Sequence, residues 1–130
     1  MNRPTHADRP LPTDAELALL QVLWKDGPST VRDVLDSLPA SKRVGYTTIL
    51  KLLQIMHEKG LVTRDESARS HVYKAAVAEN GTEALLVSDL IQRGFSGSAG
   101  RLVLRALSTQ KATTTELNEI RTLLDRLEDE

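Results

Sequence analysis

Cysteine is absent from the chain, and aromatic residues are scarce. The lack of cysteine excludes disulfide frameworks, thiolate metal sites and thiol nucleophiles, and it fits a reducing compartment. With one Phe, one Trp and two Tyr among 130 residues, any core must be built from Leu, Val, Ile and Ala. We therefore expect a mainly α-helical fold, because aliphatic cores of this kind are usually helical.

Long hydrophobic runs are also missing. No run approaches the roughly 20 apolar residues that are needed to cross a bilayer. The opening stretch, MNRPTHADRPLP, carries charges and prolines but no apolar core, which is typical of a disordered arm and not of a signal peptide. We expect a cytoplasmic protein without a membrane partner, with a disordered arm at residues 1–11, a first domain at 12–78 and a helical segment at 79–130.

A strong net charge is absent too, since the formal value is −1. Nucleic-acid-binding proteins tend to be basic, so this value alone disfavours such a partner. The distribution of charge points the other way. Residues 40–75 hold seven Lys or Arg against three acids, whereas residues 79–130 hold six against nine. The first region is therefore suited to face an anion, and the second has a different role.

Two short helices are predicted before residue 40. Thr13 and Glu16 have the spacing of a capping box, which begins the first helix, and the DGP at 26–28 ends it. The second helix begins after Ser29 or Thr30 and ends at Pro39.

A third helix and a hairpin follow. Gly60 ends the helix, whose apolar stripe is formed by Ile49, Leu52, Leu53 and Met56. The stretches LVTR and HVYKAAV then predict two strands with a charged tip, within about 61–77. Three helices and a two-stranded β-hairpin are the element order of a winged helix-turn-helix.

The face of the third helix opposite this stripe is the main candidate for a functional surface. A solvated polar face without a partner is the simplest interpretation. In a helix-turn-helix, however, the second helix of the pair enters the major groove by its N-terminus. The side chains on the helix that suit base edges and phosphates are Tyr46, Thr47, Thr48, Lys51 and Gln54. Those just before it that suit phosphates are Ser41, Lys42 and Arg43.

The tip of the hairpin, RDESARSHVYK, supplies a weaker candidate. Asp65 and Glu66 would repel DNA, and a plain solvated turn is the alternative interpretation. A wing commonly supplies one or two cations to the DNA backbone. Arg69 is the best candidate for this contact, with His71 or Lys74 in reserve.

Patterns for catalysis and metal binding are missing. His6, His57 and His71 are far apart and have no companion acid at the spacing of metal ligands. The sequence also lacks a Ser/His/Asp set, a Gly-rich phosphate loop and paired carboxylates in a plausible cleft. We expect no enzyme activity, no metal and no cofactor.

The C-terminal region has a different pattern, with helices on either side of a Gly/Ser break, RGFSGSAG. One helix is predicted from about Thr82 to Gln92, and a shorter one follows the break. Thr113 and Glu116 again have the spacing of a capping box. The last helix has a narrow seam of coiled-coil type at Leu117, Ile120, Leu124 and Leu127, with Leu123 alongside. Because so small a segment cannot bury this seam, a second subunit is favoured over a self-contained core.

Several of these stretches together resemble the penicillinase repressor family (BlaI/MecI type), which are winged-helix repressors of bacterial β-lactamase and related genes. The likeness covers about residues 11–127. It depends on LPTDAELALLQVLWKDGPSTVRDVLDSL and GYTTILKLLQIMHEKGLVTR. Within these stretches, the specific elements are the E-to-LW pattern ending in Trp24, the YTT that opens the third helix and the EKGLV before the wing. A further specific element, RGF, lies in the C-terminal region.

The resemblance implies a sequence-specific repressor that binds a palindromic operator in double-stranded DNA as a homodimer. It implies operator contacts by Tyr46, Thr47, Thr48 and Lys51, and a wing contact by Arg69. It also places the C-terminal helices at the subunit interface, with Leu86, Leu90, Leu104, Leu107, Leu117, Ile120, Leu123, Leu124 and Leu127 as its apolar residues. The alternative is a winged-helix protein-interaction module that has lost DNA binding, which the local excess of positive charge disfavours.

The chain departs from the family pattern at two points. A regulatory protease cuts well-known members at an Asn-Phe bond in a segment like LVLNF, whereas the matching LVLRAL has Arg105-Ala106 in its place. This difference argues against the same cleavage. The copper-responsive members carry a C-terminal cysteine cluster, which this chain lacks, so release by copper is not expected.

Overall fold

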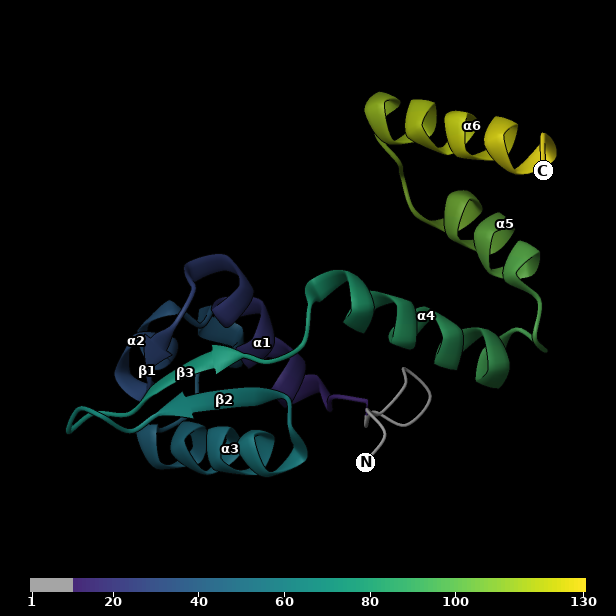
Figure 1. Ribbon diagram of the computed structural model, residues 1–130. Coiled ribbons are helices and arrows are strands. Elements are labelled where there is room, and N and C mark those ends of the chain that lie inside the picture. Colours follow the sequence, from purple (N-terminus) through teal and green to yellow (C-terminus); the bar gives the residue numbers. More distant parts are fainter. Residues whose placement is uncertain (1–10) are drawn as a thin grey trace. The chain divides into compact units, whose positions relative to one another are not determined.

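The computed structural model describes residues 11–130, so the expected arm lies almost wholly outside the described residues. The elements, in order, are α1 (Asp14–Asp26), β1 (Ser29–Thr30), α2 (Val31–Ser37), a 3₁₀ turn (Ala40–Lys42), α3 (Tyr46–Lys59), β2 (Val62–Asp65), β3 (Val72–Ala75), α4 (Glu79–Gly94), α5 (Ala99–Thr109) and α6 (Thr114–Glu128) (Figure 1). The chain divides into two compact units, which we call the winged-helix unit, up to Val87, and the C-terminal unit, Ser88–Glu130.

Reciprocal capping boxes fix the starts of α1 and α2, as the sequence indicated for α1. The backbone N–H of Glu16 donates to Thr13 Oγ1 at 3.2 Å, and the N–H of Thr13 donates to Glu16 Oε1 at 2.9 Å. Thr30 and Asp33 form the same pair of bonds, both at 3.1 Å. Each box satisfies backbone donors that a helix leaves unpaired at its N-terminus.

The expected hairpin is present, and it belongs to a sheet of three strands. β2 and β3 pair antiparallel, with Arg64 opposite Tyr73. On its other side β3 pairs with β1, so the strand order is β1-β3-β2. The sequence did not indicate β1, because a strand of two residues has no periodicity of its own and exists only through its pairing with a distant segment.

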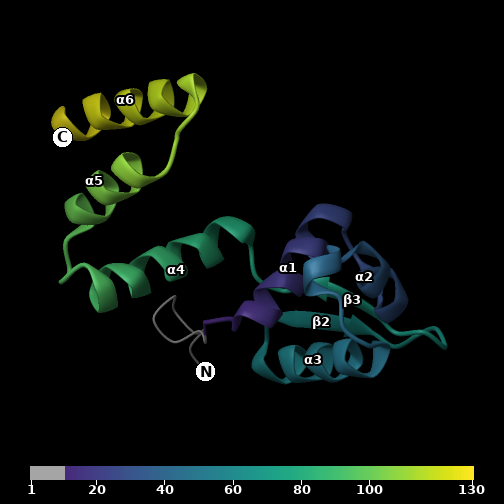
Figure 2. The same ribbon diagram turned by 180° about the vertical axis from the view of Figure 1, so that it is seen from behind.

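The core of the winged-helix unit lies between the sheet and α1, α2 and α3 (Figures 1 and 2). It is aliphatic apart from Met56 and Tyr73, as the composition predicted. The indole Nε1 of Trp24 donates to the carbonyl of Val77 at 2.9 Å, which joins α1 to the chain that leaves the hairpin. The buried apolar residues are Leu19, Leu20, Val22, Leu23, Val31, Val34, Leu35, Leu38, Ile49, Leu53, Met56, Leu61, Val62 and Tyr73.

Helix α4 is longer than the sequence predicted. It begins at Glu79, not near Thr82, and it continues through Gly94. Asn80 and Gly81, which precede the predicted start, lie inside its first turn. The helix propensity of Asn and Gly matters least there, because the first N–H groups have no intrahelical partner in any case.

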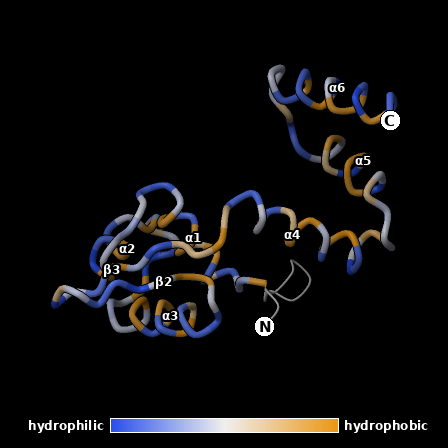
Figure 3. Tube along the Cα trace, in the orientation of Figure 1, coloured by the Kyte–Doolittle hydropathy of each residue, from blue (hydrophilic) through white to orange (hydrophobic). Residues whose placement is uncertain are grey.

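The C-terminal unit contains well-defined helix starts but no core. Ser98 Oγ accepts from the N–H of Arg101 at 3.1 Å and begins α5. The expected capping box of Thr113 and Glu116 begins α6, with bonds of 2.9 and 3.0 Å. Within residues 88–130, all of which the structure describes, none is buried. Figure 3 shows hydrophobic positions recurring along α5 and α6. No helix within residues 11–130 is both long and apolar enough to span a membrane.

Candidate nucleic-acid interface

Helix α3 has one buried face and one exposed face, as the sequence predicted. Ile49, Leu53 and Met56 are completely buried in the core. The side chains on the opposite face, including Lys51 and Gln54, are exposed. The core thus holds α3 so that a polar surface faces outward.

The N-terminus of α3 is open to a ligand. The helix begins at Gly45, which has no side chain to act as a cap, and its first turn carries no acidic residue. Tyr46, Thr47 and Thr48 in this turn are all exposed. By contrast, capping boxes occupy the starts of α1, α2 and α6. The first N–H groups of α3 and the positive end of its dipole are therefore suited to an anion such as a phosphate.

The turn before α3 contains the next group of predicted residues. Ser41 and Lys42 are exposed on the 3₁₀ turn. Arg43 is also exposed, but its Nη2 donates to the carbonyls of Asp36 at 3.3 Å and Leu38 at 3.0 Å. Arg43 therefore also closes the C-terminal end of α2, a contact that the sequence did not indicate.

At the wing, the carboxylates that would repel DNA have partners. Glu66 Oε1 lies 3.2 Å from Nη2 of Arg64 and 4.0 Å from Nε2 of His71. Asp65 Oδ1 accepts from the N–H of Ser67 at 2.9 Å, and hydrogen bonding with Ser67 lowers the pKa of the Asp65 carboxyl. Arg69 is exposed between the two strands. The wing thus presents a cation beside acids that already have local partners.

A further cation, Arg32, lies beside the predicted surface. Its Cζ atom is 5.1 Å from the centroid of the Tyr46 ring, the geometry of a cation–π contact. Both residues line a groove of about 350 Å³ between α2, α3 and the wing, which Arg69, Ser70 and His71 also line. Sequence reasoning missed Arg32, because no local pattern relates a residue on α2 to one on α3.

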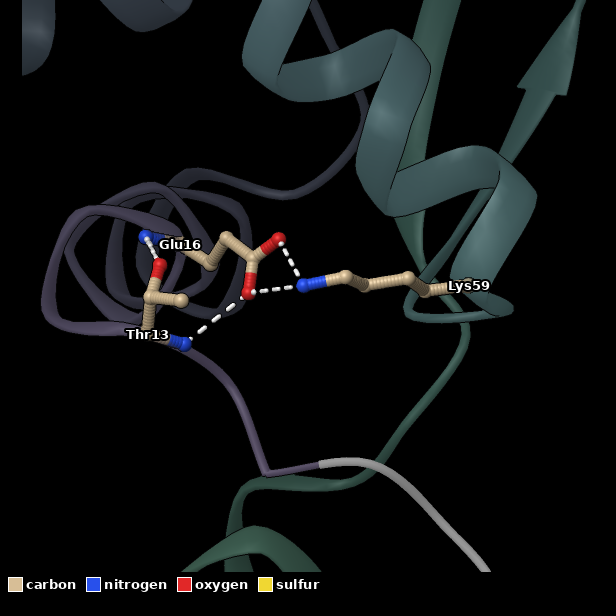
Figure 4. A network of polar contacts seen from close by, with 3 residues as sticks. All are labelled: Thr13, Glu16 and Lys59. Atoms are coloured by element: carbon tan, nitrogen blue, oxygen red, sulfur yellow. Dashed lines mark hydrogen bonds and ion pairs between the residues drawn. The ribbon is translucent and has the colours of Figure 1, made fainter.

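Lys59, by contrast, is not available to an external anion. Its Nζ lies 2.8 Å and 3.1 Å from the two carboxylate oxygens of Glu16 (Figure 4). Glu16 is 2% exposed, and this ion pair fastens the last turn of α3 to the first turn of α1. The positive charge around α3 is therefore divided. Lys59 is held by Glu16, Arg43 is exposed but also donates to two backbone carbonyls, and Lys42, Lys51 and Arg69 face solvent.

Comparison with known proteins gives consistent matches. A family model described as "Penicillinase repressor" matches residues 12–126. The penicillinase repressor of Bacillus licheniformis is 24% identical over 113 residues, which cover 87% of this chain and 88% of that protein. The transcriptional regulator BlaI of Mycobacterium tuberculosis is 36% identical over 87 residues, covering 65% of this chain and 63% of that protein.

Two further matches add a second regulator and a solved structure. The methicillin resistance regulatory protein MecI of Staphylococcus aureus is 19% identical over 114 residues, covering 88% of this chain and 93% of that protein. Among solved structures, the monomeric form of Bacillus licheniformis BlaI in complex with the blaP half-operator is 26% identical, with a TM-score of 0.45. That match covers 56% of this chain and 92% of the other.

Proposed function

The chain belongs to the penicillinase repressor family, and we propose that it is a sequence-specific transcriptional repressor that reads an operator in double-stranded DNA with α3. Its relatives are named as repressors and transcriptional regulators, not as enzymes. The observation that carries the proposal is the exposed polar face of α3, which is held outward by a buried apolar face and begins at an uncapped N-terminus.

The residues at this surface divide into two roles. Thr47, Lys51 and Gln54 project from α3 and have the chemistry of base contacts in a major groove. The residues suited to neutralise phosphates or to position the helix are Ser41, Lys42, Arg43, Thr48 and Arg69, with Tyr46 at the start of the helix. We infer that the operator contacts come from this set.

The repressor acts as a homodimer on a palindromic operator in the cytoplasm. Support for the dimer comes from the C-terminal unit, whose apolar side chains are not buried within the chain. A regulatory protease remains a candidate partner, but Arg105-Ala106 is a poor substrate bond. It lies within α5, and the carbonyl of Arg105 accepts from the hydroxyls of Ser108 and Thr109.

Binding to DNA should depend steeply on salt. If the dimer neutralises about six phosphates, the logarithm of its association constant falls with the logarithm of salt concentration at a slope near −5. Fluorescence anisotropy with fragmented genomic DNA over a series of KCl concentrations measures this slope. A slope near zero would instead favour an interaction module that does not bind DNA.

The Lys51→Ala substitution should weaken operator binding by about 1 to 3 kcal/mol, because it removes a base contact. Mobility-shift titration against a duplex selected from genomic fragments measures the loss. Lys111→Ala is the matched control, because it removes an equal charge from an exposed residue outside the winged-helix unit. Equal operator affinity in wild type and Lys51→Ala would contradict the assignment of α3 as the reading helix.

A further inference from the structure

The groove beside α3 has the composition of an anion site. Arg32 comes from α2, Tyr46 from α3, and Arg69, Ser70 and His71 from the wing. No carboxylate among residues 11–130 lines it. The acid next to Arg32 on α2, Asp33, already accepts a hydrogen bond from the N–H of Thr30 at 3.1 Å. Two arginines, Arg32 and Arg69, therefore line a polar groove. The acid beside it, Glu66, lies 4.0 Å from Nε2 of His71 and is already paired with Arg64 at 3.2 Å.

The contact with Tyr46 gives Arg32 a defined position. An exposed arginine has a flexible side chain and loses rotamer entropy when it is immobilised. With Arg32 Cζ 5.1 Å from the ring centroid, the guanidinium is held near the groove before any ligand arrives. A planar guanidinium donates two parallel hydrogen bonds to a phosphate, so this preorganisation favours phosphate over other groups.

The same contact limits what Tyr46 itself can do. The guanidinium of Arg32 covers one face of its ring, so that face is closed to a base or a thymine methyl group. Tyr46 as a whole is nevertheless 43% exposed, and it lines the groove together with Arg32. Tyr46 is therefore better placed to orient Arg32 than to read a base, which changes the role that the family resemblance implied for it.

We propose that this groove holds one phosphodiester of the DNA strand next to the reading helix. Arg32 is its main ligand, Arg69 is the second cation, and Tyr46 is the positioning residue for Arg32. The inference rests on the proposed function and deepens it. It assigns a DNA contact to α2, in addition to those made by α3 and the wing.

The test is a double-mutant cycle on Arg32 and Tyr46, with both the selected operator duplex and a random duplex as probes. Arg32→Ala should weaken both complexes by about tenfold, since it removes a charge-assisted hydrogen bond that carries no sequence information. It should also make the salt slope of the dimer shallower by about 2, one phosphate per subunit. Arg32→Lys should be intermediate, because it retains the charge without the planar fork.

The Tyr46 variants separate positioning from reading. Tyr46→Phe keeps the ring and should bind both duplexes like the wild type, whereas Tyr46→Leu should weaken both. Once Arg32 is alanine, Tyr46→Leu should have no further effect. If Tyr46→Leu in the Arg32→Ala protein further weakened binding to the operator but not to the random duplex, Tyr46 would be a base-reading residue. That result would overturn its assigned role. Thermal unfolding of each variant confirms that it is folded.

Three results distinguish the possible failures. Wild type that binds neither duplex at low salt would overturn the proposed function itself. If Lys51→Ala bound DNA weakly while Arg32→Ala bound it normally, the proposed phosphate site in the groove would be overturned and the proposed function would stand. The third result comes from inorganic phosphate in the absence of DNA. The proposal would be overturned if phosphate raised the melting temperature of the wild type but not of Arg32→Ala, while Arg32→Ala bound DNA like the wild type. The groove would then be assigned to a small anion.

Discussion

Replacing Leu124 and Leu127 together by glutamate should turn the protein into a monomer and weaken operator binding by about 10²- to 10⁴-fold. Both leucines lie on α6 and are about half exposed, at 49% and 51%. A dimer with two linked reading helices binds the operator more tightly than a monomer by this factor, because once one half-site is bound, the second helix meets its half-site at a high effective concentration. A monomer retains only the affinity of one half-site, so most of this range lies above the loss expected for a single DNA contact.

The physical reason lies in the stability of the C-terminal unit. Helix α5 has 11 residues and α6 has 15, lengths at which isolated helices are marginal in water. No residue between 88 and 130 is buried within the chain. The exposed large apolar residues of this unit are Leu90, Val103, Leu104, Leu107, Leu123, Leu124 and Leu127. Exposed apolar residues that recur along helices in this way favour an interaction surface, and a second copy of the same helices is the partner that the leucine spacing suits.

Sedimentation equilibrium and operator titration of the same samples check this prediction. Thr115→Glu combined with Thr122→Glu is the matched control, since it adds the same two charges at exposed polar positions of α6. This control should remain dimeric and bind the operator normally. Dimeric behaviour of the leucine variant, or a wild type that is strictly monomeric at working concentrations, would rule out the seam as the interface.

The features that the sequence predicted correctly depend on neighbours within a few residues. A capping box needs only two side chains three positions apart, and the boxes that open α1 and α6 occur where Thr13 and Thr113 indicated. The two faces of α3 follow equally directly, because helical geometry assigns Ile49 and Lys51 to opposite sides. The fold class and the two faces of α3 could therefore be predicted without the structure.

Three of the features that were missed join residues that are distant in sequence. β1 exists through its pairing with β3, Arg32 meets Tyr46 across two helices, and Lys59 meets Glu16 between the ends of α3 and α1. No periodicity encodes such contacts. Counting charges along residues 40–75 therefore overstated the cations available to DNA, because it could not identify those with internal partners.

The ion pair between Glu16 and Lys59 is the second feature whose loss should have a large effect. Lys59→Met should lower the free energy of unfolding by about 2 kcal/mol, below the 3 to 5 kcal/mol typical of a broken buried pair. We discount the larger value because the Lys59 side chain is 34% exposed and partly screened by water. The cost arises because the Glu16 carboxylate stays buried with only the N–H of Thr13 as its remaining donor.

Urea unfolding of a double-mutant cycle measures this coupling. Glu16→Gln should be milder than Lys59→Met, since the amide oxygen still accepts from Thr13 and Lys59 reaches solvent. The double variant should recover part of the loss, because it leaves no unpaired buried charge. Additive losses would show that the two side chains do not depend on each other, in spite of the 2.8 Å separation.

The pH dependence of stability gives an independent check. Burial raises the pKa of Glu16, but hydrogen bonds from Lys59 and Thr13 outweigh it, so the net pKa lies below the ordinary value of 4.5. The stability that Glu16 provides is therefore complete above pH 4.5 and is lost as the pH falls through its lower folded-state pKa.

In Lys59→Met the Glu16 carboxyl stays buried without its counter-charge, so the pKa of Glu16 should rise. The difference in free energy of unfolding between wild type and Lys59→Met should then narrow on acidification. A constant difference from neutral pH into the acidic range would contradict the ion pair as its cause.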